Sequence, residues 1–95
     1  MDSLRTPEAD RLFEVILRLR SIDDCYELFE DLCTIRELRD LSQRFAVAEM
    51  LGKGMSYQEI SQRTGASTAT ICRVNKCLLY GTGGYRRALE EGDKK

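Results

Sequence analysis

Residues 55–76, MSYQEISQRTGASTATICRVNK, constrain the fold of this chain more than any other stretch of its 95 residues. Ser56 stands where the N-cap of a helix is expected, and Glu59 follows it by three residues. This is the spacing of a capping box, in which each of the two side chains bonds the backbone N–H of the other residue. The box predicts a short helix over Tyr57–Thr64.

A second helix is expected directly after the first, because Gly65 can end one helix and Ser67 can begin another. Glycine enters the left-handed conformation at no steric cost, and serine is a preferred N-cap. The second helix should run to about Leu79. Two helices that cross steeply over a short turn could bury the apolar residues Ile60, Ala66, Ile71 and Val74 between them. The pattern therefore predicts a helix-turn-helix over residues 56–79.

The other face of the second helix carries short polar or basic side chains and no acid. Its members are Ser67, Thr68, Ala69, Cys72, Arg73 and Lys76. A helix that enters the major groove of double-stranded DNA needs such a face, because it must approach base edges and phosphates. An ordinary helical hairpin is the alternative, but the two caps, the turn spacing and the acid-free face together favour DNA binding.

The distribution of charge supports the same interpretation, although the net charge of −1 does not. Residues 1–40 hold 6 basic and 11 acidic side chains, whereas residues 41–87 hold 7 basic and 2 acidic ones. Positive charge therefore gathers on the predicted helix-turn-helix and its flanks, where phosphates would be contacted. A chance asymmetry is the alternative, because such a difference between halves is only a prior.

Composition argues against several other classes of protein. The chain has no apolar run of about 18 residues, which a membrane-spanning helix needs, and its polar start MDSLRTPEAD does not resemble a signal peptide. None of the four cysteines forms a C-x-x-C pair and there is no histidine, so no zinc site and no catalytic base are expected. We expect a cytoplasmic protein with reduced thiols, no metal, no cofactor and no enzymatic activity.

The rest of the sequence predicts four more helices, so that the protein is all-α with six short helices in one domain over residues 1–95. Thr6 and Pro7 form an N-cap and a first-turn proline, and Thr34 with Glu37 forms a second capping box. The four helices are expected at residues 7–20, 24–32, 35–51 and 85–91. The Gly-rich stretch at 81–84 lacks the lysine of a phosphate-binding loop, so we expect it to be a turn.

The first three predicted helices carry apolar residues on faces that one such chain cannot cover. A chain of this size hides only about 60–65% of the surface that it exposes when unfolded. Pairing with a second copy would cover the remaining apolar faces, so we expect a homodimer. A two-fold dimer would also place two helix-turn-helix motifs roughly 34 Å apart, as a palindromic operator requires.

The segment Ala69-Thr70-Ile71-Cys72-Arg73 resembles the A-T-I-T-R phrase of the Trp repressor family. Further matches lie at Met55-Ser56, Glu59, Gly65-Ala66 and Leu78, and the order of helices agrees over most of the chain. In overall form the chain is similar to the YerC/YecD group of Trp-repressor-like proteins. The resemblance implies an intertwined homodimer, interlocked through its first three and last helices, that binds an operator as a transcriptional regulator, with repression the first expectation.

The resemblance also identifies a candidate effector pocket, between the long helix and the recognition helix, where the family binds tryptophan. Thr70 and Arg73 match pocket residues of the family. Gln43 stands in place of a family arginine, with Arg44 beside it, and Cys77 in place of a serine. Val74 replaces a glycine. The valine would fill the gap that the glycine leaves for the indole. We therefore predict that L-tryptophan is not the effector, and that the motif either needs no ligand or uses an unidentified small molecule.

The residues predicted to contact DNA also differ from the family pattern, so the operator should differ from the tryptophan operator. On the first helix, Gln58 and Ser61 stand where the family has basic residues. The candidate contacts are Gln58, Ser61, Arg63, Ser67, Thr68, Ala69, Cys72 and Lys76. Cys72 could pack against a thymine methyl group or act as a redox switch. A protein-interaction module that keeps this fold without binding DNA is the alternative function.

Overall fold

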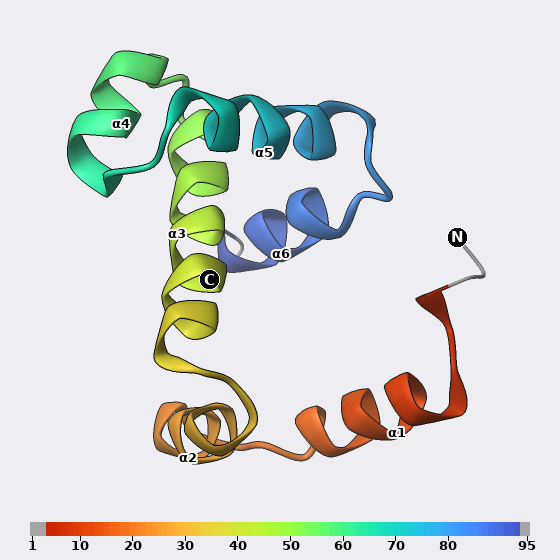
Figure 1. The fold of residues 1–95 in the computed structure, drawn as a ribbon. Helices are drawn as coiled ribbons and strands as arrows, with labels where there is room; N and C mark the ends of the chain where they lie inside the picture. The colour runs from red at the N-terminus through yellow and green to blue at the C-terminus, as the bar shows by residue number, and fades with distance from the viewer. Residues whose placement is uncertain (1–3, 94–95) are drawn as a thin grey trace. The chain divides into compact units, whose positions relative to one another are not determined.

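The structure, a computed structural model, describes residues 4–93 and contains only helices in that part of the chain. The six helices are α1 (Pro7–Ile16), α2 (Ile22–Leu32), α3 (Ile35–Gly52), α4 (Tyr57–Thr64), α5 (Thr68–Tyr80) and α6 (Gly84–Asp93) (Figure 1). The prediction of an all-α chain with six helices is confirmed. Of these helices, none combines the length and the apolar character needed to cross a membrane.

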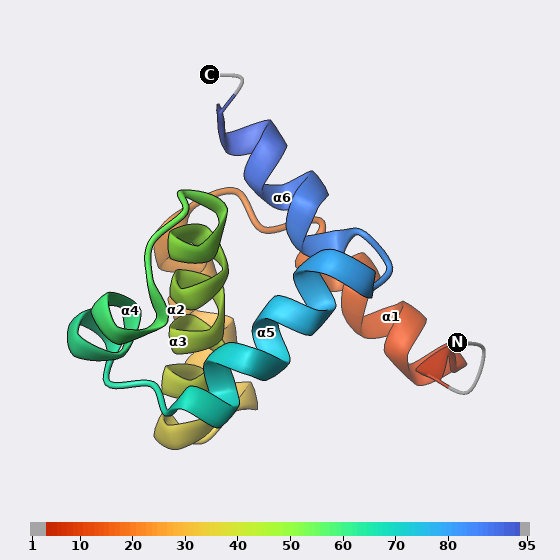
Figure 2. The ribbon, with the colours of Figure 1, turned by 90° about the horizontal axis from the view of Figure 1, so that it is seen from above.

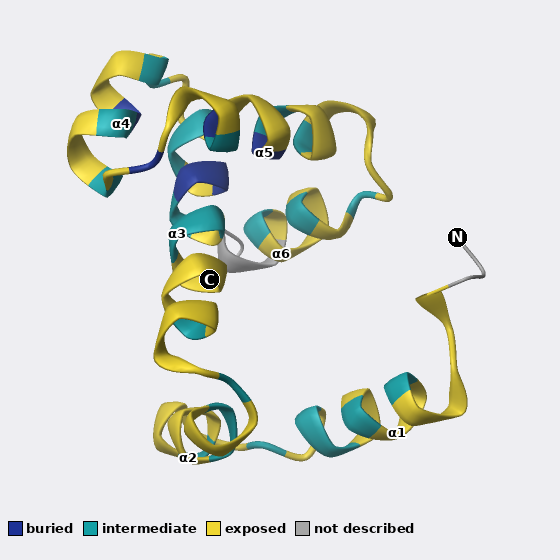
Figure 3. Cartoon of the chain, in the orientation of Figure 1, coloured by how far each residue is buried: buried dark blue, intermediate teal, exposed yellow. Residues whose placement is uncertain are grey.

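The chain divides into two compact units. The N-terminal unit (residues 1–38) holds α1, α2 and the first turn of α3, and the C-terminal unit (residues 39–95) holds the rest of α3 and the three later helices. No described residue of the N-terminal unit is buried, although its helices carry many apolar side chains (Figure 3). All six buried residues of the described chain lie in the C-terminal unit.

The boundary between α1 and α2 differs from the prediction on both sides. Helix α1 ends at Ile16, four residues early, and α2 begins at Ile22, two residues early. Beyond α1 the chain tightens into i→i−3 bonds, of which the first joins the Arg18 N–H to the Val15 carbonyl at 3.0 Å. The Asp24 carboxylate, in the first turn of α2, accepts from the Arg20 N–H at 3.1 Å and so holds Arg20 outside α1.

Ser21 is the N-cap of α2, since its hydroxyl accepts from the Asp24 N–H at 3.0 Å. The capping box predicted for α3 is present in both directions. The Thr34 hydroxyl accepts from the Glu37 N–H at 3.0 Å, and the Glu37 carboxylate accepts from the Thr34 N–H at 2.8 Å. These bonds satisfy backbone donors that the first turn of a helix leaves without partners. Both helices therefore begin where their own sequence provides a cap.

Helix α3 ends in a Schellman motif, one residue later than predicted. Gly54 has the left-handed φ of 81° that this motif favours. Its N–H donates to the Leu51 carbonyl at 3.0 Å, and the Met55 N–H donates to the Met50 carbonyl at 3.2 Å. Met50 and Met55 both pack against the core. The turn therefore leads the chain directly from α3 into α4.

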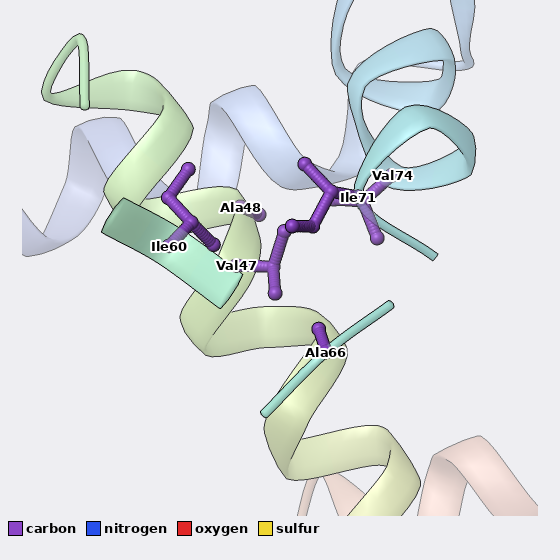
Figure 4. Close-up of a cluster of buried hydrophobic side chains, with 6 residues drawn as sticks. All are labelled: Val47, Ala48, Ile60, Ala66, Ile71 and Val74. Atoms are coloured by element: carbon purple, nitrogen blue, oxygen red, sulfur yellow. The ribbon is translucent and has the colours of Figure 1, made fainter. Parts of the chain in front are cut away.

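The core of the C-terminal unit joins α3, α4, α5 and the turn between the last two (Figure 4). It consists of Val47, Ala48, Ile60, Ala66, Ile71 and Val74, each at most 2% exposed. The four residues predicted to meet between the two helices of the motif are all among them. Full burial of one isoleucine or valine side chain contributes about 1.5–3 kcal/mol. This core therefore holds the helix-turn-helix against the end of α3.

Helix α5 continues from the turn after α4 to the glycine loop before α6 (Figure 2). The loop is a turn, as predicted. A Cβ at Gly81 would collide with the Cys77 carbonyl oxygen, and Gly83 has a left-handed φ of 97°. The Arg86 guanidinium, from the first turn of α6, donates to the Leu78 carbonyl at 2.9 Å. The start of α6 is thereby attached to the end of α5.

Candidate nucleic-acid interface

We call residues 56–80 the reading head; it consists of the Ser56 cap, α4, the turn and α5. Both predicted N-caps are present. The Ser56 hydroxyl accepts from the Glu59 N–H at 3.1 Å, and the Ser67 hydroxyl accepts from the Thr70 N–H at 3.1 Å. The return bond of the first box is not among the hydrogen bonds found in residues 4–93. The Glu59 carboxylate instead lies 3.5 Å from Nη2 of Arg63.

The turn between the two helices is built around Gly65, as predicted. Its φ of 76° is left-handed, and its N–H donates to the Ser61 carbonyl at 2.8 Å. A residue with a side chain would be strained in this conformation, because its Cβ approaches the following backbone. The glycine therefore allows the chain to leave α4 and begin α5 within a few residues.

Side chains on both sides of this glycine complete the hydrogen bonds of the turn. The Ser61 hydroxyl donates to the Ala66 carbonyl at 2.8 Å. The Thr64 hydroxyl donates to the Ile60 carbonyl at 2.8 Å and accepts from the Ala66 N–H at 3.1 Å. These part-buried groups would otherwise lack partners, which is costly inside a protein. They fix the conformation of the turn and with it the direction in which α5 leaves α4.

Most of the predicted DNA-contact residues lie on the surface of the reading head. The exposed ones are Gln58, Arg63, Ser67, Thr68, Ala69, Cys72 and Lys76. On α5, positions 69, 72 and 76 follow the three-and-four spacing that keeps them on one helix face. Ser61 differs from the others, because it is half-buried and its hydroxyl already bonds within the turn.

The charges on the surface of the reading head are compatible with the binding of DNA phosphates. Helix α5 has no acidic residue in its first turn, so the positive end of its dipole is not offset there. Arg63 is paired with Glu59, but their side chains are 61% and 47% exposed. An exposed pair of this kind contributes only about 0–1 kcal/mol, so the arginine can exchange its partner for a phosphate at little cost.

The residues of the candidate effector pocket differ in their burial and in their hydrogen-bond partners. Val74 is 2% exposed within the core, and the half-buried Gln43 donates from Nε2 to the Thr64 carbonyl at 3.1 Å. The Thr70 hydroxyl accepts from the Ser67 hydroxyl at 3.1 Å. Of the rest, Arg44 is half-buried, and Arg73 and Cys77 are exposed. Two of the six residues therefore already serve the packing of the reading head.

Two structural roles were not predicted from the sequence. Arg86 bonds the last carbonyls of α5, with Nη2 donating to the Leu79 oxygen at 3.2 Å besides the bond from Nε. The bond from Gln43 to the end of α4 was also missed. A basic residue soon after a glycine loop is a weak signal for the first role, and no local pattern indicates the second. Among residues 4–93, no group of three His, Cys, Asp or Glu side chains could hold a metal ion.

Comparison with known proteins gives consistent results. A model of the family described as Trp repressor protein matches residues 7–93. The uncharacterized protein YerC of Bacillus subtilis (strain 168) is 51% identical over 90 residues, which are 95% of this chain and 86% of that protein. A TrpR-like protein from Eubacterium eligens has 49% identity and a TM-score of 0.93, over 96% of this chain and 94% of that one. The crystal structure of a candidate Trp repressor from Staphylococcus aureus has 42% identity and a TM-score of 0.93, over 99% and 94% of the two chains.

Proposed function

The chain belongs to the Trp repressor family, and from that premise we propose that it is a sequence-specific, DNA-binding transcriptional regulator that acts as a homodimer. The observation that carries this proposal is the exposed, acid-free face of α5 on a fixed helix-turn-helix. The regulator works in the cytoplasm, has no catalytic role, and represses rather than activates. Residues 1–95 act together as one DNA-binding domain.

In this proposal α5 enters the major groove and α4 lies across the DNA backbone. Thr68, Ala69 and Cys72 are short enough to let the helix approach base edges, where methyl and hydroxyl groups distinguish thymine from the other bases. Arg63 and Lys76 contact phosphates, which fixes the position of the helix without reading sequence. Gln58 bonds adenine or a phosphate, because its amide can both donate and accept.

The N-terminal unit supplies the dimer interface in this proposal. Its exposed large apolar side chains are Leu4, Phe13, Leu17, Ile22, Tyr26, Leu32 and Ile35. Four of them are at least 74% exposed, and the exposure of apolar surface to water is unfavourable. Apolar surface of this extent marks an interaction site, and a second copy of the chain is the partner that also explains a two-fold operator.

We propose further that L-tryptophan is not the effector. The Val74 side chain is 2% exposed and packs with the core that joins α3 to the reading head. An indole ring in that space would have to displace the valine and open the core. The effector, where one is used, is therefore a different small molecule.

Selection of genomic DNA fragments by the purified protein, at two salt concentrations, tests the proposed function. Enrichment of one palindromic motif, with affinity that falls steeply as salt rises, is the expected result. Replacement of Arg63 and Lys76 by glutamate should weaken binding roughly tenfold or more, because two phosphate contacts become repulsive. A control is Arg5→Glu, a single exposed charge reversal in the N-terminal unit. Equal binding by both variants would contradict the proposal.

A protein-interaction module is the second candidate function. The observation in its favour is the excess of 11 acidic over 6 basic residues in positions 1–40. Such a surface repels DNA and would attract a basic protein partner. Absence of DNA binding at either salt concentration, together with capture of a partner that survives the Arg63 and Lys76 reversals, would favour this function.

A further inference from the structure

One hydrogen bond ties the reading head to a helix outside it. Gln43, a half-buried residue of α3, donates from Nε2 to the Thr64 carbonyl at 3.1 Å, and the two residues are 21 positions apart. Thr64 is the last residue of α4, and the last carbonyls of a helix have no partner within the helix. The glutamine therefore satisfies a part-buried backbone group at the point where the turn begins.

The Thr64 carbonyl belongs to the same residue that organises the turn. The Thr64 hydroxyl joins the Ile60 carbonyl to the Ala66 N–H, so the end of α4 and the start of the turn move together. The other hydrogen bonds found for this turn within the described residues have both partners in the reading head. The Gln43 bond joins the turn to α3.

The apolar core joins the same elements but constrains them differently. Gln43 lies one helical turn before Val47, on the face of α3 that packs against Ile60 and Ile71. The hydrophobic contacts that hold α3 against the motif are non-directional. A hydrogen bond requires a defined distance and angle. The amide therefore adds a directional constraint to the packing of the core.

From this we propose that Gln43 is a positioning residue, whose amide fixes the end of α4 to α3 so that the reading head is set for DNA without any small-molecule effector. The proposal rests on the proposed DNA-binding function and deepens it. A protein whose reading head is set by its own side chains has its binding-competent state populated in advance, so no ligand is needed to raise its apparent affinity.

The test replaces Gln43 by methionine, which removes the donor but keeps the length and the helix propensity of the side chain. Amide exchange at Gly65 and Ala66 should then be roughly three- to tenfold faster, as expected for the loss of one hydrogen bond. DNA affinity should fall by roughly two- to tenfold, because the loosened turn must be ordered again when DNA binds. Gln43→Arg, which keeps an N–H donor, should restore the exchange protection.

Gln62→Met is the matched control for amide exchange, because Gln62 is an exposed glutamine of α4; it should leave exchange at Gly65 and Ala66 unchanged. The bond can also be tested directly in the wild-type protein, by a nuclear Overhauser effect between the Gln43 side-chain amide and Thr64. Absence of this effect would overturn the proposal, even if the variants fail to fold. Wild-type exchange and affinity in Gln43→Met would overturn it too. DNA binding by the wild type only after L-tryptophan is added would overturn the ligand-free setting. Failure of the wild type to bind any DNA would overturn the proposed function, while the exchange data still report on the turn.

Discussion

Both units of this protein consist of helices, but they differ in what stabilises them. Helices of both units begin at side-chain N-caps: Thr6, Ser21 and Thr34 in one, Ser56 and Ser67 in the other. Among the residues that the structure describes, buried side chains occur only in the C-terminal unit. Capping and amphipathic spacing are therefore enough to define helices, but they do not by themselves provide a core. The N-terminal unit has capped helices, but none of its described side chains is buried.

The largest loss of stability is expected from a change in the core of the C-terminal unit. Ile71→Ala should lower the free energy of unfolding by about 2–5 kcal/mol, because it removes a fully buried side chain and leaves a cavity. The loss should not depend on protein concentration. Ile22→Ala, at a side chain that is 75% exposed in the single chain, should cost little in dilute protein and more in concentrated protein. Urea unfolding at two protein concentrations measures both, and equal costs for the two changes would contradict the distinction between the units.

The next largest effect is expected on dimerisation. The double change Leu17→Glu and Ile22→Glu places two charges among apolar side chains that are 83% and 75% exposed. If a second copy covers them, the dimer dissociation constant should rise at least about tenfold, which corresponds to about 1.4 kcal/mol. Sedimentation measures the change.

The matched control for dimerisation is Gln58→Glu with Gln62→Glu, which adds the same charge to exposed positions of α4. It should weaken DNA binding and leave the dimer intact. A wild-type protein that is a folded monomer at micromolar concentration would break the comparison, because the N-terminal unit would then be stable without a partner.

A smaller loss of stability, of the same size in both units, is expected when an N-cap is removed. Ser21→Ala in the N-terminal unit and Ser56→Ala in the C-terminal unit each remove one hydroxyl that accepts a backbone N–H. Each should cost about 1 kcal/mol. Thermal unfolding of the two variants compares them directly. A cost confined to the C-terminal unit would mean that the caps of α1 and α2 do not contribute to the folded state.

No effect is expected from L-tryptophan. The chain contains no tryptophan, so the fluorescence of added ligand can be followed without background. Val74 fills its site in the core and should prevent saturable binding below about 100 µM, which corresponds to about 5.5 kcal/mol. Val74→Gly provides the comparison, since it opens space beside α3. Saturable binding to the wild-type protein in this range would contradict the prediction.

The sequence by itself determined the features that depend on neighbours within about four residues. Both capping residues of the reading head, the left-handed Gly65 and the capping box of α3 were predicted and are present. The buried faces of α4 and α5 also followed from spacing. These predictions succeeded because a cap or a helix face is set by local geometry. The end of α1 was predicted four residues too late, because no stop signal marks Ile16 and the Arg20 N–H bonds the Asp24 carboxylate of the next helix.

Only the tertiary structure decided which polar side chains act inside the protein. Ser61 is predicted to contact DNA, and the structure adds that its hydroxyl bonds the Ala66 carbonyl within the turn. Gln43 was predicted to line a pocket, and its amide bonds the end of α4. Arg86 bonds the end of α5, eight residues from Leu78. Local spacing does not indicate such roles, because each depends on where separate helices are brought together by the shared core. The physical reason is that a long polar side chain can reach either water or a distant backbone group, and the packing of the helices decides between them.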